Sequence, residues 1–299
     1  MNAPLLTTPR VEPFFFDAEP GTRFSLYHAP NPQVAPRRAI LYVHPFADEL
    51  TRTRRMAALQ SRAFAELGFA VLQIDLFGCG DSCGEFSAGR WQVWRDDLGL
   101  AAAWLAERES GPLTLWGLRL GGLLALDVAA QLKPRRLLLW QPYLSGRACI
   151  NQFLRLSAQL HDPAPGAPRS TSALRAQLAV HGAIEVAGFE VAVPLVKAID
   201  ACDAAQLSLP PCDIHWLAYP GPAPVRAAAG AARLKERWAA YGAQLHYQQL
   251  STSDLSTSDL STSHPNGAQP GGPVWSGAGH LDCPELRAAT ATLFAGEPT

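Results

Sequence analysis

The segment W-G-L-R-L-G-G, residues 116–122, has the spacing of a nucleophile elbow, the sharp G-x-S-x-G turn between a strand and a helix. Gly117 and Gly121 occupy the two glycine positions, where the backbone turns sharply and neighbouring elements come close. Arg119 stands at the centre, where the motif has its serine. A guanidinium stays protonated in proteins and is no nucleophile. The spacing therefore predicts the turn, while the residue type argues against serine chemistry there.

A second glycine-rich loop, D-L-F-G-C-G-D-S at residues 75–82, follows a predicted strand. A serine at the end of such a loop usually satisfies backbone groups, so we expect a structural Ser82 and keep a nucleophilic Ser82 as the minor alternative. The loop also begins like the dinucleotide fingerprint G-x-G-x-x-G, but Cys83 replaces the third glycine and no acidic residue ends a strand about 20 residues later. We therefore expect neither a dinucleotide nor any other cofactor.

The segment H-P-F, residues 44–46, ends the first clear strand and resembles the segment whose backbone N–H completes an oxyanion hole. Proline has no N–H, whereas Phe46 and Ala47 keep theirs, and Leu120 adds the N–H that follows the elbow residue. The alternative, held equal, is that His44 only packs against the end of the sheet.

The base of a catalytic triad is expected between the last strand and the last helix, where His280 lies. His264 is a weaker candidate beside a repetitive segment. Neither usual position for the acid is filled, because residues 219–235 contain no Asp or Glu and only Asp162 precedes Glu185 after Trp140. Two of the three triad positions therefore fail on residue type.

Strand-like and helix-like segments alternate around these motifs. Continuously apolar runs predict strands at residues 39–43, 70–76, 113–116 and 137–140, with helices between them at 52–67, 91–106 and 120–132. Such continuous runs are typical of a parallel sheet covered by helices on both faces. The alternation of strands and helices resumes later, with strands predicted at residues 214–218 and 244–250 and helices at 224–241 and 284–294. Two further short strands are predicted near the start of the sequence, at 14–16 and 24–27.

Residues 142–210 do not continue the alternation of strands and helices. We interpret them as an inserted cap with helices at 152–160 and 173–179 and a possible hairpin around Gly188. The core then consists of residues 1–141 and 211–299. Its second part contains a low-complexity loop, residues 251–273, in which S-T-S-D-L is repeated. We expect a solvated loop that expanded neutrally, rather than a functional repeat.

Four segments together resemble the α/β-hydrolase superfamily, and most closely the bacterial family called exosortase A system-associated hydrolase 2. They are H-P-F-A-D-E-L-T-R-T-R-R-M (44–56), V-L-Q-I-D-L-F-G-C-G-D-S (71–82), L-W-G-L-R-L-G (115–121) and L-L-W-Q-P-Y-L-S-G (138–146), with a weaker match in V-A-G-F (186–189). The resemblance implies an α/β-hydrolase fold and association with exopolysaccharide loci of bacteria that sort proteins through exosortase. It implies no defined substrate, and the repeat departs from it.

Three roles stay open for the site. Arg119 at a helix N-terminus could bind a carboxylate or phosphate. Water could be activated by His44, Asp81 or His280 for hydrolysis of an acyl or ester-type bond. The chain could also be a degenerate hydrolase that serves as a binding or assembly factor, acting on a small-molecule, acyl-linked or saccharide-linked ligand.

Arg54 is a further ligand-binding candidate, in a basic cluster with Arg52 and Arg55 at the start of a predicted helix. Ligands of open α/β sheets bind at the carboxyl ends of the strands, where this cluster is expected. A solvated basic face is the alternative.

Composition narrows the class of protein. The chain has 299 residues, 48% of them hydrophobic and 17% charged, which excludes a disordered chain. A formal net charge of −1 gives no reason to expect a nucleic-acid partner. The most apolar stretch, residues 113–130, carries Arg119 and Asp127, so no membrane span is expected. Six scattered cysteines without an export signal favour reduced thiols in the cytoplasm and no structural metal.

Overall fold

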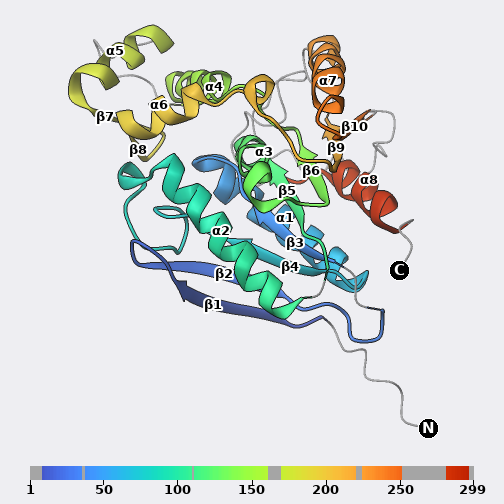
Figure 1. The fold of residues 1–299 in the computed structure, drawn as a ribbon. Helices are drawn as coiled ribbons and strands as arrows, with labels where there is room; N and C mark the ends of the chain where they lie inside the picture. The colour runs from blue at the N-terminus through green and yellow to red at the C-terminus, as the bar shows by residue number, and fades with distance from the viewer. Residues whose placement is uncertain are drawn as a thin grey trace, which may run out of the picture.

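The computed structural model describes residues 9–35, 38–109, 111–160, 170–219, 224–250 and 281–295. Its centre is an eight-stranded sheet in the order β1-β2-β4-β3-β5-β6-β9-β10 (Figure 1). The strands are β1 Val11–Asp17, β2 Thr22–His28, β3 Ala39–Val43, β4 Ala70–Ile74, β5 Thr114–Leu118, β6 Arg136–Trp140, β9 Asp213–Ala218 and β10 Gln244–Gln249. Strand β2 pairs antiparallel with both β1 and β4. The other pairings in this sheet, β4 with β3, β3 with β5, β5 with β6, β6 with β9 and β9 with β10, are parallel.

The sequence explains this arrangement. Every residue of β3 and β5 is buried, as expected of continuously apolar strands in the middle of a parallel sheet. In β1 and β2 the burial alternates, because one face of this antiparallel edge is more exposed than the other. The two strands predicted around the Pro20-Gly21 turn are β1 and β2.

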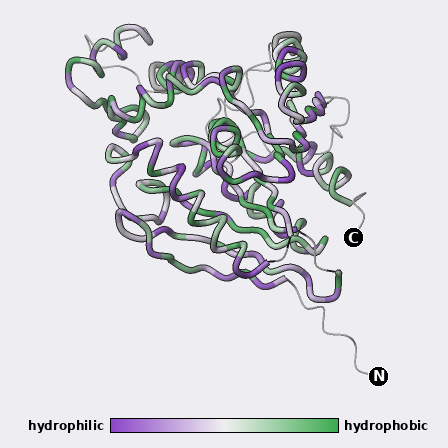
Figure 2. Tube along the Cα trace, in the orientation of Figure 1, coloured by the Kyte–Doolittle hydropathy of each residue, from purple (hydrophilic) through white to green (hydrophobic). Residues whose placement is uncertain are grey.

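Helices cover both faces of the sheet. On one face α1 (Asp48–Glu66) and α8 (Pro284–Ala295) bury Phe64, Trp116 and Phe294 in one hydrophobic cluster. On the other face α2 (Trp91–Arg108) and α3 (Leu120–Leu132) pack Leu98 and Leu123 into a larger cluster. In Figure 2 the colour along α2 alternates between hydrophobic and hydrophilic, as expected of a helix with one face on the sheet. A further helix, α7 (Pro224–Ala239), packs beside β10.

The segment between β6 and β9 contains α4 (Gly146–Leu160), α5 (Thr171–His181), β7 (Ala183–Val186), β8 (Phe189–Ala192) and α6 (Val193–Ala201). These elements gather at one end of the sheet in Figure 1, beyond α2. There β8 contacts the short 3-10 helix η1 (Phe86–Ala88), and the rings of Phe189 and Phe86 lie 5.2 Å apart. The α4 residue Phe153 lies 5.1 Å from Phe46, so this segment covers the end of β3. Residues 142–210 as a separate cap stay a prediction.

One predicted helix start is corrected, and one helix was missed. The helix predicted from residue 52 begins at Asp48, where Asp48 and Glu49 place acidic side chains in the first turn, as the helix dipole favours. The helix α6 was not predicted, although Pro194 in its first turn is a typical start signal. Around Gly188 the hairpin is present, formed by β7 and β8.

Three features predicted from the sequence fall outside the described residues: the low-complexity loop 251–273, His264 and His280. Among the residues that are described, no helix is both long enough and apolar enough to span a bilayer.

Candidate active site

The predicted elbow connects β5 to α3. Arg119 lies between them with φ 56° and ψ −117°, a conformation that a non-glycine residue adopts at a sharp, strained turn. A Cβ atom on Gly121 would lie 2.2 Å from the carbonyl oxygen of Val43, and one on Gly117 would lie 2.5 Å from the Cα of Gly122. Glycine is therefore required at both positions of this tight turn between a strand and a helix.

The guanidinium of Arg119 is buried between two partners. Its Nε lies 3.1 Å from Oε1 of Glu49, and its Nη2 donates to the hydroxyl of Tyr143 at 2.5 Å. The Arg119 guanidinium carbon also lies 4.2 Å from the centre of the Tyr143 ring. The residue as a whole is 5% exposed. Arg119 therefore points into the protein and binds a carboxylate of the same chain.

Burial and charge act in opposite directions on this pair. Burial lowers the pKa of the Arg119 guanidinium, but the carboxylate of Glu49 beside it holds that pKa above its usual value. Burial raises the pKa of Glu49, and the positive charge of Arg119 opposes the rise. The hydroxyl of Tyr143 also has a raised pKa, again because of burial first, so it keeps its proton. The three side chains form a compact internal cluster.

A second turn of the same shape lies on the neighbouring strand. Ala47, before α1, has φ 51° and ψ −125°, close to the values of Arg119. The two turns follow β3 and β5, which pair in parallel, so α1 and α3 both begin at the carboxyl-terminal edge of the sheet, where these strands end. Both helix N-termini therefore direct their partly positive ends toward this edge.

A small pocket lies at this edge, with room for about one water-sized group. Phe46, Ala47 and Leu120 line it together, and none of their N–H groups donates a backbone hydrogen bond within the described part of the chain. The rest of the wall is mostly apolar and includes Trp91 and Trp94. The structure thus brings together three of the residues predicted for an oxyanion hole, and the pocket could hold a carbonyl oxygen.

His44 also lines this pocket, but both of its ring nitrogens are engaged by the backbone. Its Nδ1 lies 2.7 Å from the carbonyl oxygen of Pro45, and the N–H of Leu76 donates to its Nε2 at 3.2 Å. Nε2 therefore accepts, and the proton belongs on Nδ1. Burial lowers the pKa of His44, which favours this neutral form. These contacts account for His44 as a structural residue, and water activation by it stays a prediction.

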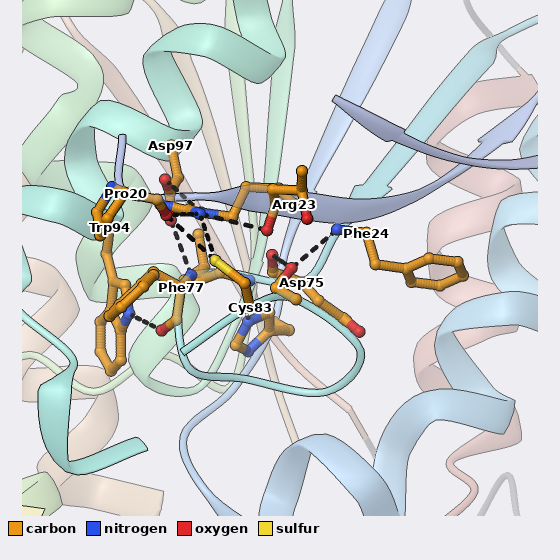
Figure 3. A network of polar contacts seen from close by, with 12 residues as sticks. Pro20, Arg23, Phe24, Asp75, Phe77, Cys83, Trp94 and Asp97 are labelled. Atoms are coloured by element: carbon orange, nitrogen blue, oxygen red, sulfur yellow. Dashed lines mark hydrogen bonds and ion pairs between the residues drawn. The ribbon is translucent and has the colours of Figure 1, made fainter. Parts of the chain in front are cut away.

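Ser82 makes two backbone hydrogen bonds. Its hydroxyl accepts from the N–H of Phe24 at 2.9 Å and donates to the carbonyl oxygen of Asp75 at 2.5 Å. Figure 3 shows the contact between Phe24 and this loop. Ser82 thereby fastens the loop of residues 75–82 to strand β2, the kind of structural role that the sequence favours for it.

A buried ion pair supports the same loop from the other side (Figure 3). Nε of Arg23 lies 2.7 Å from Oδ1 of Asp97, and both side chains are at most 1% exposed. The other Asp97 oxygen accepts from the N–H of Phe77 at 2.8 Å, while the Trp94 indole donates to the Phe77 carbonyl at 2.9 Å. Burial raises the pKa of Asp97, and its bonds to Arg23 oppose the rise. Strand β2, the loop and α2 are joined at this point.

Arg54 and Asp81 belong to the outer side of this loop. Nη2 of Arg54 lies 2.7 Å from Oδ2 of Asp75, and that oxygen also accepts from the N–H of Asp81. The Asp81 side chain is exposed, and neither Arg54 nor Asp81 lines the pocket beside Arg119. Arg54 as a ligand-binding residue and Asp81 as a base stay predictions.

Sequence reasoning missed three residues that surround Arg119. A second small pocket is lined by Phe46, Asp48, Glu49, Tyr143, Cys149 and Phe153. Glu49 lies two residues after Ala47, the last residue of the predicted oxyanion segment. Tyr143 lies three residues after Trp140, where a strand ends. Their positions shortly after strands place them at the same end of the sheet as Arg119, but nothing in the sequence pairs them with it. Cys149 is buried on α4, and burial raises its pKa well above the usual value, so its thiol is protonated.

Comparisons with known proteins agree with this architecture. The model of a family described as "Serine aminopeptidase, S33" matches residues 34–188. A search of curated protein sequences gives no match.

Several solved structures share the fold. Est1E from Butyrivibrio proteoclasticus, solved with ferulic acid bound, is 16% identical with a TM-score of 0.57, over 79% of this chain and 89% of that one. XC6422 from Xanthomonas campestris, described as an α/β serine hydrolase without lid, is 18% identical with a TM-score of 0.50, over 83% and 87%. Alpha/beta hydrolase domain-containing protein 10 from mouse is 15% identical with a TM-score of 0.53, over 80% and 88%. Such identities show the fold, and the α/β-hydrolase fold expected from the sequence is confirmed.

Proposed function

Because the chain belongs to the serine aminopeptidase S33 family (Hydrolase_4) of α/β-hydrolases, we propose that it uses this scaffold to bind a ligand at the edge of the sheet beside Arg119, without serine chemistry. One observation carries the proposal. The residue at the elbow between β5 and α3 is an arginine, and its guanidinium is bound by Glu49 and Tyr143 of the same chain.

The chemistry of the cluster supports binding over catalysis. A guanidinium cannot attack a carbonyl carbon. Without an activated nucleophile, an oxyanion pocket and substrate binding retain only a small part of the rate enhancement of a serine hydrolase. The neighbouring groups do not replace the nucleophile, because His44 is held by the backbone through both nitrogens and the Cys149 thiol is protonated.

The same cluster argues against Arg119 as an anion site. Its charge is matched by the buried carboxylate of Glu49, so a carboxylate or phosphate ligand would have to compete with that ion pair. We therefore propose a ligand without net negative charge at this point of the site.

The cellular setting is proposed from the sequence resemblance alone. The segments at residues 44–56, 71–82, 115–121 and 138–146 support a place in an exosortase-linked exopolysaccharide system. There the chain would be a cytoplasmic binding or assembly factor for a small-molecule, acyl-linked or saccharide-linked ligand. No contact with exosortase itself is proposed.

The pocket lined by Phe46, Ala47 and Leu120 favours a second candidate function. Its N–H groups could stabilise the oxyanion formed when water attacks an acyl or ester carbonyl. In this alternative His280 would activate the water, as its position between the last strand and the last helix suggests. The chain would then be a hydrolase without a serine nucleophile.

Two measurements on purified protein separate these possibilities. Intact-mass spectrometry after incubation with a fluorophosphonate probe tests for an activated serine, in the unchanged protein and in Ser82→Ala and His280→Ala. A panel of short-chain esters tests for turnover. We expect no adduct and no turnover. An adduct lost in Ser82→Ala would overturn the proposal, and turnover lost in His280→Ala would establish the second candidate.

A further inference from the structure

The carboxylate of Glu49 is only half satisfied. Its Oε1 binds Arg119, whereas its Oε2 is buried and has no hydrogen-bond partner within the described residues. The side chain is 8% exposed. A buried polar oxygen without a partner is uncommon and costs free energy, more so when it carries charge. Since Glu49 lines the second pocket, a ligand there could supply the missing hydrogen bond.

The charges around this pocket are already balanced. Glu49 pairs with Arg119, and Asp48 pairs with Arg52 at 3.6 Å. An added ammonium group would lie near the buried guanidinium, and an added anion would lie near two carboxylates. Either would also lose its hydration on entry. The pocket therefore favours an uncharged group that donates a hydrogen bond to Glu49.

Tyr143 adds the complementary group. Because Arg119 can only donate, the Tyr143 oxygen accepts from Nη2, and its own proton is left to donate to another group. The lining of the pocket thus includes an acceptor that lacks a partner within the described residues, Oε2 of Glu49, and a donor, the Tyr143 hydroxyl, beside the Asp48 carboxylate that pairs with Arg52. Phe46 and Phe153 supply apolar walls, with ring centres 5.1 Å apart.

We propose that this pocket holds an uncharged hydroxyl group of the ligand, which donates to Oε2 of Glu49 and accepts from the hydroxyl of Tyr143. A hydroxyl both donates and accepts, so it matches the two groups, and its carbon packs against the aromatic walls. The pocket has room for about one water-sized group, which suits a hydroxyl. The assignment rests on the proposed function, in which the site binds its ligand.

The neighbouring pocket suggests what the rest of the ligand contains. Phe46 lines both pockets, so the two lie beside the same side chain. The first pocket offers the N–H groups of Ala47 and Leu120 to a carbonyl oxygen. A hydroxylated ester or amide would satisfy both pockets at once.

The test compares two neutral probes that differ in one hydroxyl group, methyl 3-hydroxybutanoate and methyl butanoate. Binding is measured with the full chain by ligand-observed NMR titration. We expect the hydroxylated ester to bind at least about tenfold more tightly, as a hydrogen bond to a charged acceptor implies. Equal affinity for the two esters, or no binding of either, would overturn the hydroxyl assignment. This comparison needs no variant protein.

Variants then locate the effect. Glu49→Gln replaces the free acceptor by a donor, and Tyr143→Phe removes the donor but keeps the ring, so each should reduce the preference for the hydroxylated ester several-fold. Glu66→Gln is the matched control, an exposed glutamate on the same helix, and should keep the full preference. A preference that survives in both site variants would place the hydroxyl elsewhere and overturn the assignment.

The same spectra keep the two proposals apart. Release of methanol from either ester would show hydrolysis and overturn the binding function proposed above. The ranking of the two probes is read from their affinities and is not altered by slow turnover. A failure of the hydroxyl assignment without methanol release would leave the binding function standing.

Discussion

Arg119 Nε and Glu49 Oε1, 3.1 Å apart, join the start of α3 to the first turn of α1. The two helices follow the neighbouring strands β3 and β5, so the ion pair links the two helix N-termini at the carboxyl ends of these strands. Both side chains are more than nine-tenths buried, with 6% and 8% exposed. In such a pair each charge depends on the other, because neither has water to replace its partner.

Removing the cation should therefore be costly. We expect Arg119→Ala to lower the free energy of unfolding by about 3–5 kcal/mol, since it leaves the Glu49 carboxylate buried and unpaired. Urea denaturation measures this loss. Arg55→Ala is the control, because the Arg55 side chain is 68% exposed and its ion pair should contribute less than about 1 kcal/mol. Equal stability losses in the two variants would contradict a buried ion pair at the elbow.

The double variant Arg119→Met with Glu49→Leu tests whether the loss of stability comes from the unpaired charge. If charge alone makes the single variant unstable, apolar side chains of similar size at both positions should recover most of the loss. Urea denaturation of the double variant measures the recovery. A double variant less stable than Arg119→Ala would mean that the contact with Tyr143, rather than the ion pair, carries the stability of the turn.

The network around Asp97 should be equally sensitive. Asp97→Ala removes the partner of buried Arg23 and the acceptor of the Phe77 N–H. We expect a loss of about 3–5 kcal/mol in the free energy of unfolding and faster hydrogen exchange at the Phe77 amide. Asp96→Ala, which removes an exposed neighbour on the same helix, is the control. Unchanged exchange at Phe77 would show that Asp97 does not hold this loop.

Ser82→Ala should affect stability rather than any chemistry. The change leaves the Phe24 N–H and the Asp75 carbonyl without their partner in a buried loop, so we expect a loss of about 1–3 kcal/mol in the free energy of unfolding. Ser87→Ala, on the 3-10 helix η1, should cost much less because its hydroxyl makes no hydrogen bond within the described residues. Thermal and urea denaturation of both variants test the difference. Similar losses would contradict the structural role of Ser82.

The free energy of unfolding should decrease as the pH is lowered through the weakly acidic range. Burial first, and Arg62 second, lower the pKa of His28 from 6.5 to about 4, and both of its ring nitrogens lack partners within the described residues. Between these two pH values the unfolded chain binds a proton that the folded chain does not, so acid favours unfolding. The loss on going from pH 7 to pH 4 is roughly 3 kcal/mol from this residue.

His28→Leu isolates this contribution. The free energy of unfolding of the variant should change less between pH 7 and pH 4 than that of the unchanged protein. Urea denaturation at a series of pH values gives both curves. Parallel curves would mean that His28 is not responsible for the pH dependence. His215, whose pKa is also lowered to about 4 by burial and then by Arg136, acts in the same direction in both proteins.

The sheet and its order of elements were predictable because their signals are local. The strands β3, β4, β5 and β6 are short, mostly apolar runs, and the helices between them are marked by recurring apolar residues. The elbow was predictable for the same reason, since Gly117 and Gly121 meet neighbouring backbone that leaves no space for a side chain. The early start of α1 was missed because the apolar pattern begins after its acidic first turn.

The partners of Arg119 were not predictable in the same way. Glu49 is 70 residues away in the sequence, and no local pattern marks it as the buried carboxylate beside the elbow. The sequence suggested an arginine open to an anionic ligand, whereas the structure places an anion of the same chain on it. For His44, the residue type allowed both a base and a packed side chain, and the two backbone hydrogen bonds favour the packed one.

The position of α8 has a consequence for folding during translation. Phe294 packs between Phe64 and Phe69, with ring centres 4.8 and 5.3 Å away, so this part of the core is complete only once residue 294 has been synthesised. Until α8 emerges from the ribosome, Phe64 and Phe69 lack this partner. A nascent chain that ends before α8 therefore exposes apolar surface here, the kind of surface that chaperones bind.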